Sequence, residues 1–150
     1  MMNIFGIVFC LSLSFAVIVN GKFAPCGGSA KITKVICNGK DMETEQMCIL
    51  KKAENSTLSV TFQADKPVKS ITSVCHGIIG GIPVPFNGID TNGCDGIQGG
   101  CPLAAGKTYT FTTQIPVKKI YPSIKLAIKW EEMMDSKTDA WCLVIPAEIL

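Results

Sequence analysis

Cys75 and His76 are the residues of this chain whose types could supply a nucleophile and a base, and the chain has no other histidine. A Cys–His dyad requires both side chains to converge within hydrogen-bond reach. The pair falls in a stretch with strand character, where neighbouring side chains point to opposite faces. We therefore predict that no dyad forms, that His76 has a structural role and that Cys75 is a buried, inert thiol. No catalytic residue is assigned, and the protein is predicted not to be an enzyme.

Other arrangements that support chemistry are missing from the sequence. It contains no Gly-x-Ser-x-Gly nucleophile motif and no glycine-rich phosphate loop before a helix. One histidine is too few for the usual zinc sites, and cysteines in an oxidising compartment are consumed by disulfides. All 14 basic residues are lysines, so no guanidinium is available for phosphates or base edges. We expect no metal, no cofactor and no nucleic-acid partner.

The elements that must position any site begin after an amino-terminal leader. A continuous apolar run follows the first three residues and ends at Asn20-Gly21, which is typical of a secretory signal peptide. We predict that residues 1–21 are the signal peptide and that residues 22–150 form one domain. The protein is expected to be secreted, with the lysosome lumen as a further destination. A sequon at Asn55-Ser56-Thr57, interpreted as a turn before a strand, predicts glycosylation of Asn55.

Seven cysteines remain after the leader, which in a secreted domain of this size indicates a disulfide framework and one free thiol. Six paired cysteines allow about 15 connectivities, so spacing does not settle the pattern. The simplest pairing joins near neighbours and leaves Cys75 free. It gives the pairs Cys37–Cys48 and Cys94–Cys101, with Cys26–Cys142 joining the two ends of the domain.

The dominant sequence period is two, which is typical of half-buried antiparallel strands. Apolar and polar residues alternate over residues 58–64, 108–115 and 124–131. Weaker strands are predicted over residues 30–36, 48–53, 68–79 and 140–149, and residues 131–138 are interpreted as a hairpin turn. Seven or eight short strands separated by turns predict an all-β fold, a sandwich of two antiparallel sheets.

The stretch from His76 to Leu103 contains more apolar groups than a solid core needs. Its first part, Ile78 to Phe86, is broken by Pro83 and Pro85, which exclude a central strand. If the two sheets diverge, this surplus lines an apolar pocket; the alternative is simple core packing. A lipid that buried a few hundred Å² there would gain on the order of 10 kcal/mol before the costs of association.

An ordered series of motifs resembles the Niemann–Pick type C2 and ML (lipid-recognition) family. The series comprises Cys26-Gly, the PVPF element that ends at Phe86, Cys101-Pro-Leu, Lys107-Thr-Tyr, Pro116-Val117, the YPSIKL segment from Tyr121, Trp130, and Cys142 followed by Ile145-Pro146. The resemblance covers essentially the whole chain after the leader. It implies an immunoglobulin-like sandwich with a lipid tunnel between its sheets, and the three disulfides given above.

The resemblance also implies residue roles. The lipid would contact apolar and aromatic groups at the tunnel mouth and one group deeper inside, namely Phe86, Val117, Tyr121, Pro122 and Trp130. Ile82 and Val84 would face a membrane or a membrane-bound acceptor.

The leading hypothesis is a secreted, monomeric carrier that binds a sterol and passes it to a membrane or a membrane-bound acceptor in a transient contact. The alternative is a carrier of fatty acids, semiochemicals or microbial lipids. Segment 87–92, which lacks the prolines of vertebrate relatives, and Trp141 before rather than after Cys142 favour this alternative. A third hypothesis, from another class, is an adhesion or recognition module with a filled core.

Overall fold

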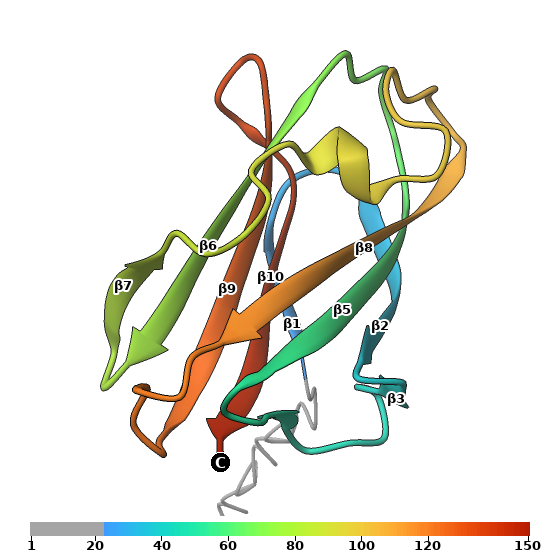
Figure 1. Ribbon diagram of the computed structural model, residues 1–150. Coiled ribbons are helices and arrows are strands. Elements are labelled where there is room, and N and C mark those ends of the chain that lie inside the picture. The colour runs from blue at the N-terminus through green and yellow to red at the C-terminus, as the bar shows by residue number, and fades with distance from the viewer. Residues whose placement is uncertain (1–22) are drawn as a thin grey trace, which may run out of the picture.

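The structure is a computed structural model, and its described part comprises residues 23–150. The predicted signal peptide, residues 1–21, lies outside this part. Within residues 23–150, no helix has the length and apolar character needed to cross a membrane. The fold is a sandwich of two sheets that cross at an angle and enclose the core between them (Figure 1).

The first sheet has the strand order β1-β10-β9-β6-β7, and β4 pairs in parallel with the end of β10. The second sheet has the order β3-β2-β5-β8, and the remaining named pairs in both sheets are antiparallel. The first sheet comprises β1 (Ala24–Gly27), β4 (Cys48–Leu50), β6 (Ile71–Ile79), β7 (Ile82–Phe86), β9 (Lys125–Met134) and β10 (Asp139–Ile149). The second comprises β2 (Lys31–Cys37), β3 (Lys40–Asp41), β5 (Glu54–Gln63) and β8 (Thr108–Val117), and a short 3-10 helix, η1 (Gly93–Gly96), lies in the β7–β8 connection. The predicted all-β sandwich is confirmed.

Alternating burial along the strands shows why these residues form sheets. From Ser56 onward, every second residue of β5 is buried, and every second residue of β8 is buried from Phe111 onward. Their outward faces are rich in threonine, with hydroxyl contacts such as Thr61 to Thr110 across the pair. Such a surface has one dry and one wet face, as the period-two pattern predicts.

Two sequence interpretations need correction. Residues 131–138 were interpreted as a turn, but β9 continues to Met134, and the turn is confined to residues 135–138, closed by the Met134 N–H donating to the Thr138 carbonyl. Asn55 also lies within β5 rather than in a turn before it, although its side chain is exposed as expected.

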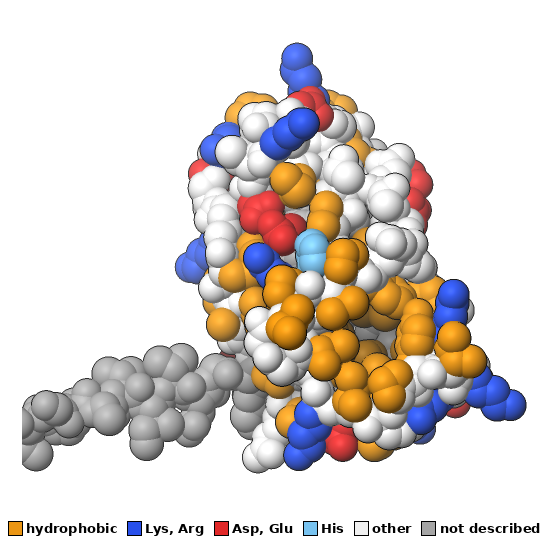
Figure 2. Space-filling view, turned by 90° about the vertical axis from the view of Figure 1, so that its left-hand side faces the viewer, with side chains coloured by type: hydrophobic (Ala, Val, Ile, Leu, Met, Phe, Trp, Pro, Cys, Tyr) orange, Lys and Arg blue, Asp and Glu red, His pale blue; other side chains and the backbone are white. Residues whose placement is uncertain are grey.

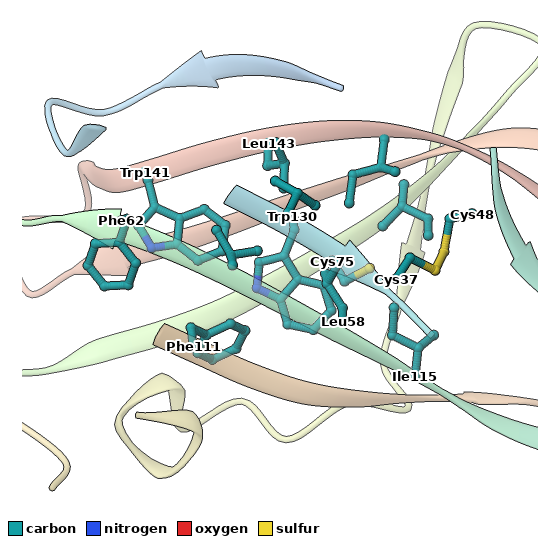
Figure 3. Close-up of a cluster of buried hydrophobic side chains, with 14 of the residues drawn as sticks. Cys37, Cys48, Leu58, Phe62, Cys75, Phe111, Ile115, Trp130, Trp141 and Leu143 are labelled. Atoms are coloured by element: carbon teal, nitrogen blue, oxygen red, sulfur yellow. A yellow bond between two sulfur atoms is a disulfide. The ribbon is translucent and has the colours of Figure 1, made fainter. Parts of the chain in front are cut away.

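The space between the two sheets has a half that is filled by packed side chains and a half that contains a cavity. Phe62, Phe111, Trp130 and Trp141 are buried and pack with ring centroids about 5.8 Å apart at each of three contacts (Figure 3). These rings fill the half of the sandwich near η1. The three disulfides are Cys26–Cys142, Cys37–Cys48 and Cys94–Cys101, the pairs that the sequence analysis favoured, and Cys75 is a free, buried thiol.

Candidate functional site: an apolar cavity between the sheets

An apolar cavity of about 270 Å³ occupies the other half of the sandwich. Figure 2 shows its opening as a hollow surrounded by hydrophobic side chains. Both sheets and the loop before β9 contribute to its wall. The lining residues are Leu50, Cys75, His76, Gly77, Ile79, Val84, Pro85, Phe86, Ile115, Pro116, Val117, Tyr121, Pro122, Ile124, Leu126, Ile128 and Ile149.

Small residues on β6 leave this space open. The inward positions of β6 next to the aromatic core are Cys75 and Gly77, opposite Trp130 and Ile128 of β9. A Cβ added to Gly77 would lie 3.3 Å from a methyl group of Leu126, so larger side chains there would enter the cavity wall. Close packing ordinarily leaves few voids larger than a water molecule. This cavity is therefore larger than ordinary packing defects, and its wall of aliphatic and aromatic carbon suits an apolar ligand.

The mouth is framed by an aromatic pair. The rings of Phe86 and Tyr121 meet edge to face, with centroids 6.2 Å apart, and so bring together the end of β7 and the β8–β9 loop. Prolines on both sides stiffen the frame, because each fixes φ and removes a backbone donor. Two side chains beside the mouth are strongly exposed: Ile82 at 66% and Ile120 at 85%.

Four of the five residues expected to contact a lipid line this cavity together: Phe86, Val117, Tyr121 and Pro122. Of the two residues expected to face a membrane, Ile82 is fully on the outside, whereas Val84 is 43% exposed and also lines the cavity. Because β7 is an edge strand at the mouth, one side of Val84 lines the cavity while the other side contacts solvent.

Trp130 does not line the cavity. It lies one inward position beyond Ile128 on β9, is fully buried, and packs against Phe111. Its indole Nε1 donates to Oε1 of Glu132, 2.6 Å away, which fixes the ring within the solid core. Trp130 therefore lies behind the inner wall of the cavity, next to the lining residues Ile128 and Cys75, and the prediction that it contacts a ligand along the tunnel is not supported by this position.

Glu132 is the residue that sequence reasoning missed. Its side chain is 1% exposed, and Oε1 accepts hydrogen bonds from both Trp130 Nε1 and Ser73 Oγ, the latter at 2.7 Å. Oε2 is buried and has no hydrogen-bond partner among the described residues. Burial raises the pKa of Glu132 to about 7, although both hydrogen bonds act to lower it. Glu132 continues the inward alternation of Ile128 and Trp130 along β9, and this period could have predicted its burial. The adjacent Glu131 hides the period, because two consecutive glutamates do not alternate in polarity.

Comparison with known proteins identifies the framework. Residues 21–149 match the ML domain. The chain belongs to the ML domain family. Its relatives include the zebrafish (Danio rerio) protein named NPC intracellular cholesterol transporter 2, which is 34% identical over 152 aligned positions that cover 99% of this chain and 97% of that protein. The ecdysteroid-regulated 16 kDa protein of Manduca sexta is 32% identical, over 85% of this chain and 87% of the relative.

A solved structure gives the same result for the ML fold. The crystal structure of a Niemann–Pick type C2 protein from Japanese carpenter ant superposes with a TM-score of 0.76 at 25% sequence identity. The match covers 85% of this chain and 98% of that chain. The resemblance seen in the sequence motifs is thus confirmed over essentially the whole domain. Several of these relatives are named as intracellular cholesterol transporters.

The free thiol of this ML domain lies at the inner wall of the cavity. Burial raises the pKa of Cys75 to about 12, so the side chain stays a neutral thiol and presents a weakly polar, compact surface. His76 pairs with Lys129 and Pro85 at the next strand position, and strand alternation directs its ring away from Cys75, although His76 also borders the cavity. The two side chains therefore do not converge. The Nδ1 of His76 is buried and has no hydrogen-bond partner among the described residues.

A carboxyl cluster lies apart from the cavity of the ML domain, near the Cys26–Cys142 disulfide. Ligand atoms of Glu131, Asp139 and Cys142 lie within 4.8 Å of one another. The Cys142 sulfur belongs to a disulfide and is therefore no thiolate ligand. Burial, and next the hydrogen bond and negative charge of Glu131, raise the pKa of Asp139 to about 6. Without the sulfur, the cluster is a pair of neighbouring carboxyl groups.

Proposed function

We propose that this protein is a secreted sterol carrier that holds one sterol in the cavity and transfers it to a membrane or a membrane-bound acceptor. The observation that carries the proposal is the apolar cavity with its aromatic mouth, in a chain that belongs to the ML domain family. Several relatives bear the name of an intracellular cholesterol transporter, which favours a sterol over fatty acids or semiochemicals.

Binding would be driven by desolvation and shape. Each Å² of apolar surface removed from water contributes about 25 cal/mol, and the wall offers almost no competing polar group. The apolar body of the sterol would enter past Phe86 and Tyr121, and its hydroxyl would remain at the mouth, where water can solvate it. A charged clamp is unnecessary, because contact area alone supplies the affinity.

Transfer would use the exposed apolar side chains beside the mouth. Ile82 and Val84 on β7 lie on one side of the opening, and Ile120 lies in the β8–β9 loop next to Tyr121. The exposed Lys118 and Lys119 precede Ile120 and could meet anionic headgroups. This arrangement supports a transient contact in which the ligand leaves directly into the lipid phase.

The remaining parts of the proposal concern the protein's environment. The predicted signal peptide at residues 1–21, the three disulfides and the exposed sequon asparagine Asn55 support secretion, glycosylation at Asn55 and residence outside cells or in the lysosome lumen. We propose that the carrier acts as a monomer and without catalytic activity.

The test is binding of a fluorescent sterol to the wild-type protein and to Val117→Phe. Val117 is buried in the cavity wall, so a phenyl ring there should fill part of the sterol's space and weaken binding strongly. The matched control is Val74→Phe, the same change on the outward face of β6. Competition by long-chain fatty acids is measured alongside. Equal sterol affinity in all three proteins would refute the pocket assignment, and preferential displacement by fatty acids would replace sterol with the alternative ligand class.

A further inference from the structure

Glu132 connects two parts of the sandwich that matter to the cavity. Its Oε1 accepts from Trp130 Nε1 and so holds the ring that packs behind the inner wall of the cavity, next to Cys75 and Ile128. The same oxygen accepts from Ser73 Oγ, which joins Glu132 to β6. The backbone N–H of Ser73 donates to the carbonyl of Thr91 at 2.8 Å. Thr91 belongs to the loop that continues directly from Phe86 at the mouth. One carboxyl group therefore links the Trp130 ring behind the inner wall of the cavity to the loop at its rim.

The second oxygen of the carboxyl faces the same loop. A Cβ added to Gly93 would overlap Oε2 of Glu132 and press on Ile71, so the loop backbone packs directly on this oxygen. Oε2 has no hydrogen-bond partner among the described residues. A buried charged oxygen without a partner is unfavourable by several kcal/mol, whereas its protonated form is tolerated. The packing of the loop on Glu132 is thus compatible with the neutral acid and opposed by the carboxylate.

No cation offsets the charge of Glu132 within residues 23–150. The neighbours recorded around its side chain are uncharged: Ser73 and Ile71 from β6, Trp130 from β9, Trp141 opposite on β10, and Gly93 from η1. The titratable groups on the neighbouring elements do not contact the Glu132 carboxyl group. Glu131 and Asp139 are neighbours in another cluster, His76 lies on the face of β6 opposite to Ser73 and Cys75, and Asp90 and Asp95 are exposed in the loop.

We propose that Glu132 is a positioning residue that makes ligand exchange depend on pH: the neutral acid holds the rim loop against the Trp130 ring that supports the inner wall of the cavity, and the carboxylate loosens this contact. The proposal rests on the proposed function, since it concerns release of the ligand from the same cavity. Ionisation favours entry of water at Oε2, which separates the loop at Gly93 from β9 and weakens the Ser73–Thr91 link. Because burial moves the titration of Glu132 to near neutral pH, the carrier retains its ligand in acidic fluid and releases it faster as the pH rises.

The experiment follows transfer of a fluorescent sterol from the protein to excess vesicles of neutral phosphatidylcholine, between about pH 5 and about pH 8. Wild type is expected to release the sterol several-fold faster at the higher pH. Glu132→Gln keeps an acceptor for Ser73 and Trp130 but cannot ionise, so its release should be slow and independent of pH. The matched control Asp139→Asn removes the other carboxyl group with a strongly raised pKa, and it should keep the wild-type profile. An equal pH profile in wild type and Glu132→Gln would overturn the proposal.

A measurement without ligand separates this inference from the proposed function. Trp130 donates directly to Glu132, so tryptophan fluorescence of the ligand-free protein should show a transition near neutral pH that Glu132→Gln and Trp130→Phe both abolish. Ser73→Ala removes one bond that favours the carboxylate and should move this transition to higher pH. A transition that persists in Glu132→Gln, or a Ser73→Ala midpoint equal to wild type, would overturn the inference even if sterol binds. Failure of sterol binding with the transition present would instead overturn the proposed function.

Discussion

The burial of Glu132 makes a quantitative prediction about folding stability. In the unfolded chain its pKa is near the ordinary value of 4.5, and in the folded protein burial raises the pKa to about 7. A tenfold difference in proton affinity corresponds to about 1.4 kcal/mol, so the proton stabilises the folded state by about 3 kcal/mol when the carboxyl group is fully protonated in both states.

The sign follows from the direction of the pKa shift. A raised folded-state pKa means that the native protein binds more protons than the unfolded chain between the two values. The stabilisation is fully present below about pH 4.5 and is lost as the pH rises through about 7. The contribution of Glu132 to the free energy of unfolding should therefore fall by about 2 to 3 kcal/mol between about pH 5 and about pH 8.

The perturbation is Glu132→Gln, and the assay is denaturant unfolding at both pH values with the disulfides intact. Other groups titrate equally in the two proteins, so the difference between them isolates residue 132. We expect the stability of Glu132→Gln relative to wild type to increase by about 2 to 3 kcal/mol from about pH 5 to about pH 8. An identical pH dependence in both proteins would show that Glu132 does not titrate in this range and would refute the reasoning.

Three further predictions concern the framework. Gly93→Ala should lower the free energy of unfolding by about 2 kcal/mol or more, because its Cβ would overlap Glu132 and Ile71. The control Gly27→Ala meets only ordinary contacts and should change the free energy of unfolding little; equal effects of the two substitutions in denaturant unfolding would contradict the packing. Replacing both Cys26 and Cys142 by alanine opens a loop of 116 residues and should lower stability by about 4 to 5 kcal/mol, measured the same way; a loss below about 1 kcal/mol would contradict the estimate. Asn55→Gln should remove a glycosidase-sensitive mass from protein secreted by eukaryotic cells, and an unchanged mass would exclude glycosylation at Asn55.

The fold was accessible from the sequence because its strands keep a strict period of two. The alternation over residues 58–64 and 108–115 fixed both the strands and their inward faces, and the structure places these faces in the core. Proline content predicted that residues 78–86 could not be a central strand. This is confirmed for Pro83 and Pro85, which lie in the edge strand β7, and is wrong for Ile78 and Ile79, which end the inner strand β6 before the first proline. The motif series that ends at Phe86 and begins at Tyr121 located the mouth, where the two rings meet.

What the sequence did not reveal depends on tertiary contacts. Trp130 has the same place in the strand pattern whether it lines a cavity or packs behind the cavity wall, and only its tertiary contacts with Phe111 and Glu132 distinguish the two. Glu132 follows another glutamate, and charged pairs usually mark a solvated turn. Its burial becomes possible because Ser73 on β6 and Trp130 on β9 both supply donors, a coincidence between strands about 60 residues apart in the chain.

The most direct test of the carrier function is mass spectrometry of lipid extracted from the protein after gentle purification from sterol-containing eukaryotic cells. Wild type should yield one sterol per chain, and Val117→Phe, with its cavity partly filled, should yield much less while Val74→Phe matches wild type. Wild-type protein that carries no sterol, and takes up none when it is offered, would contradict the claim that the space between the two sheets is a sterol-binding site.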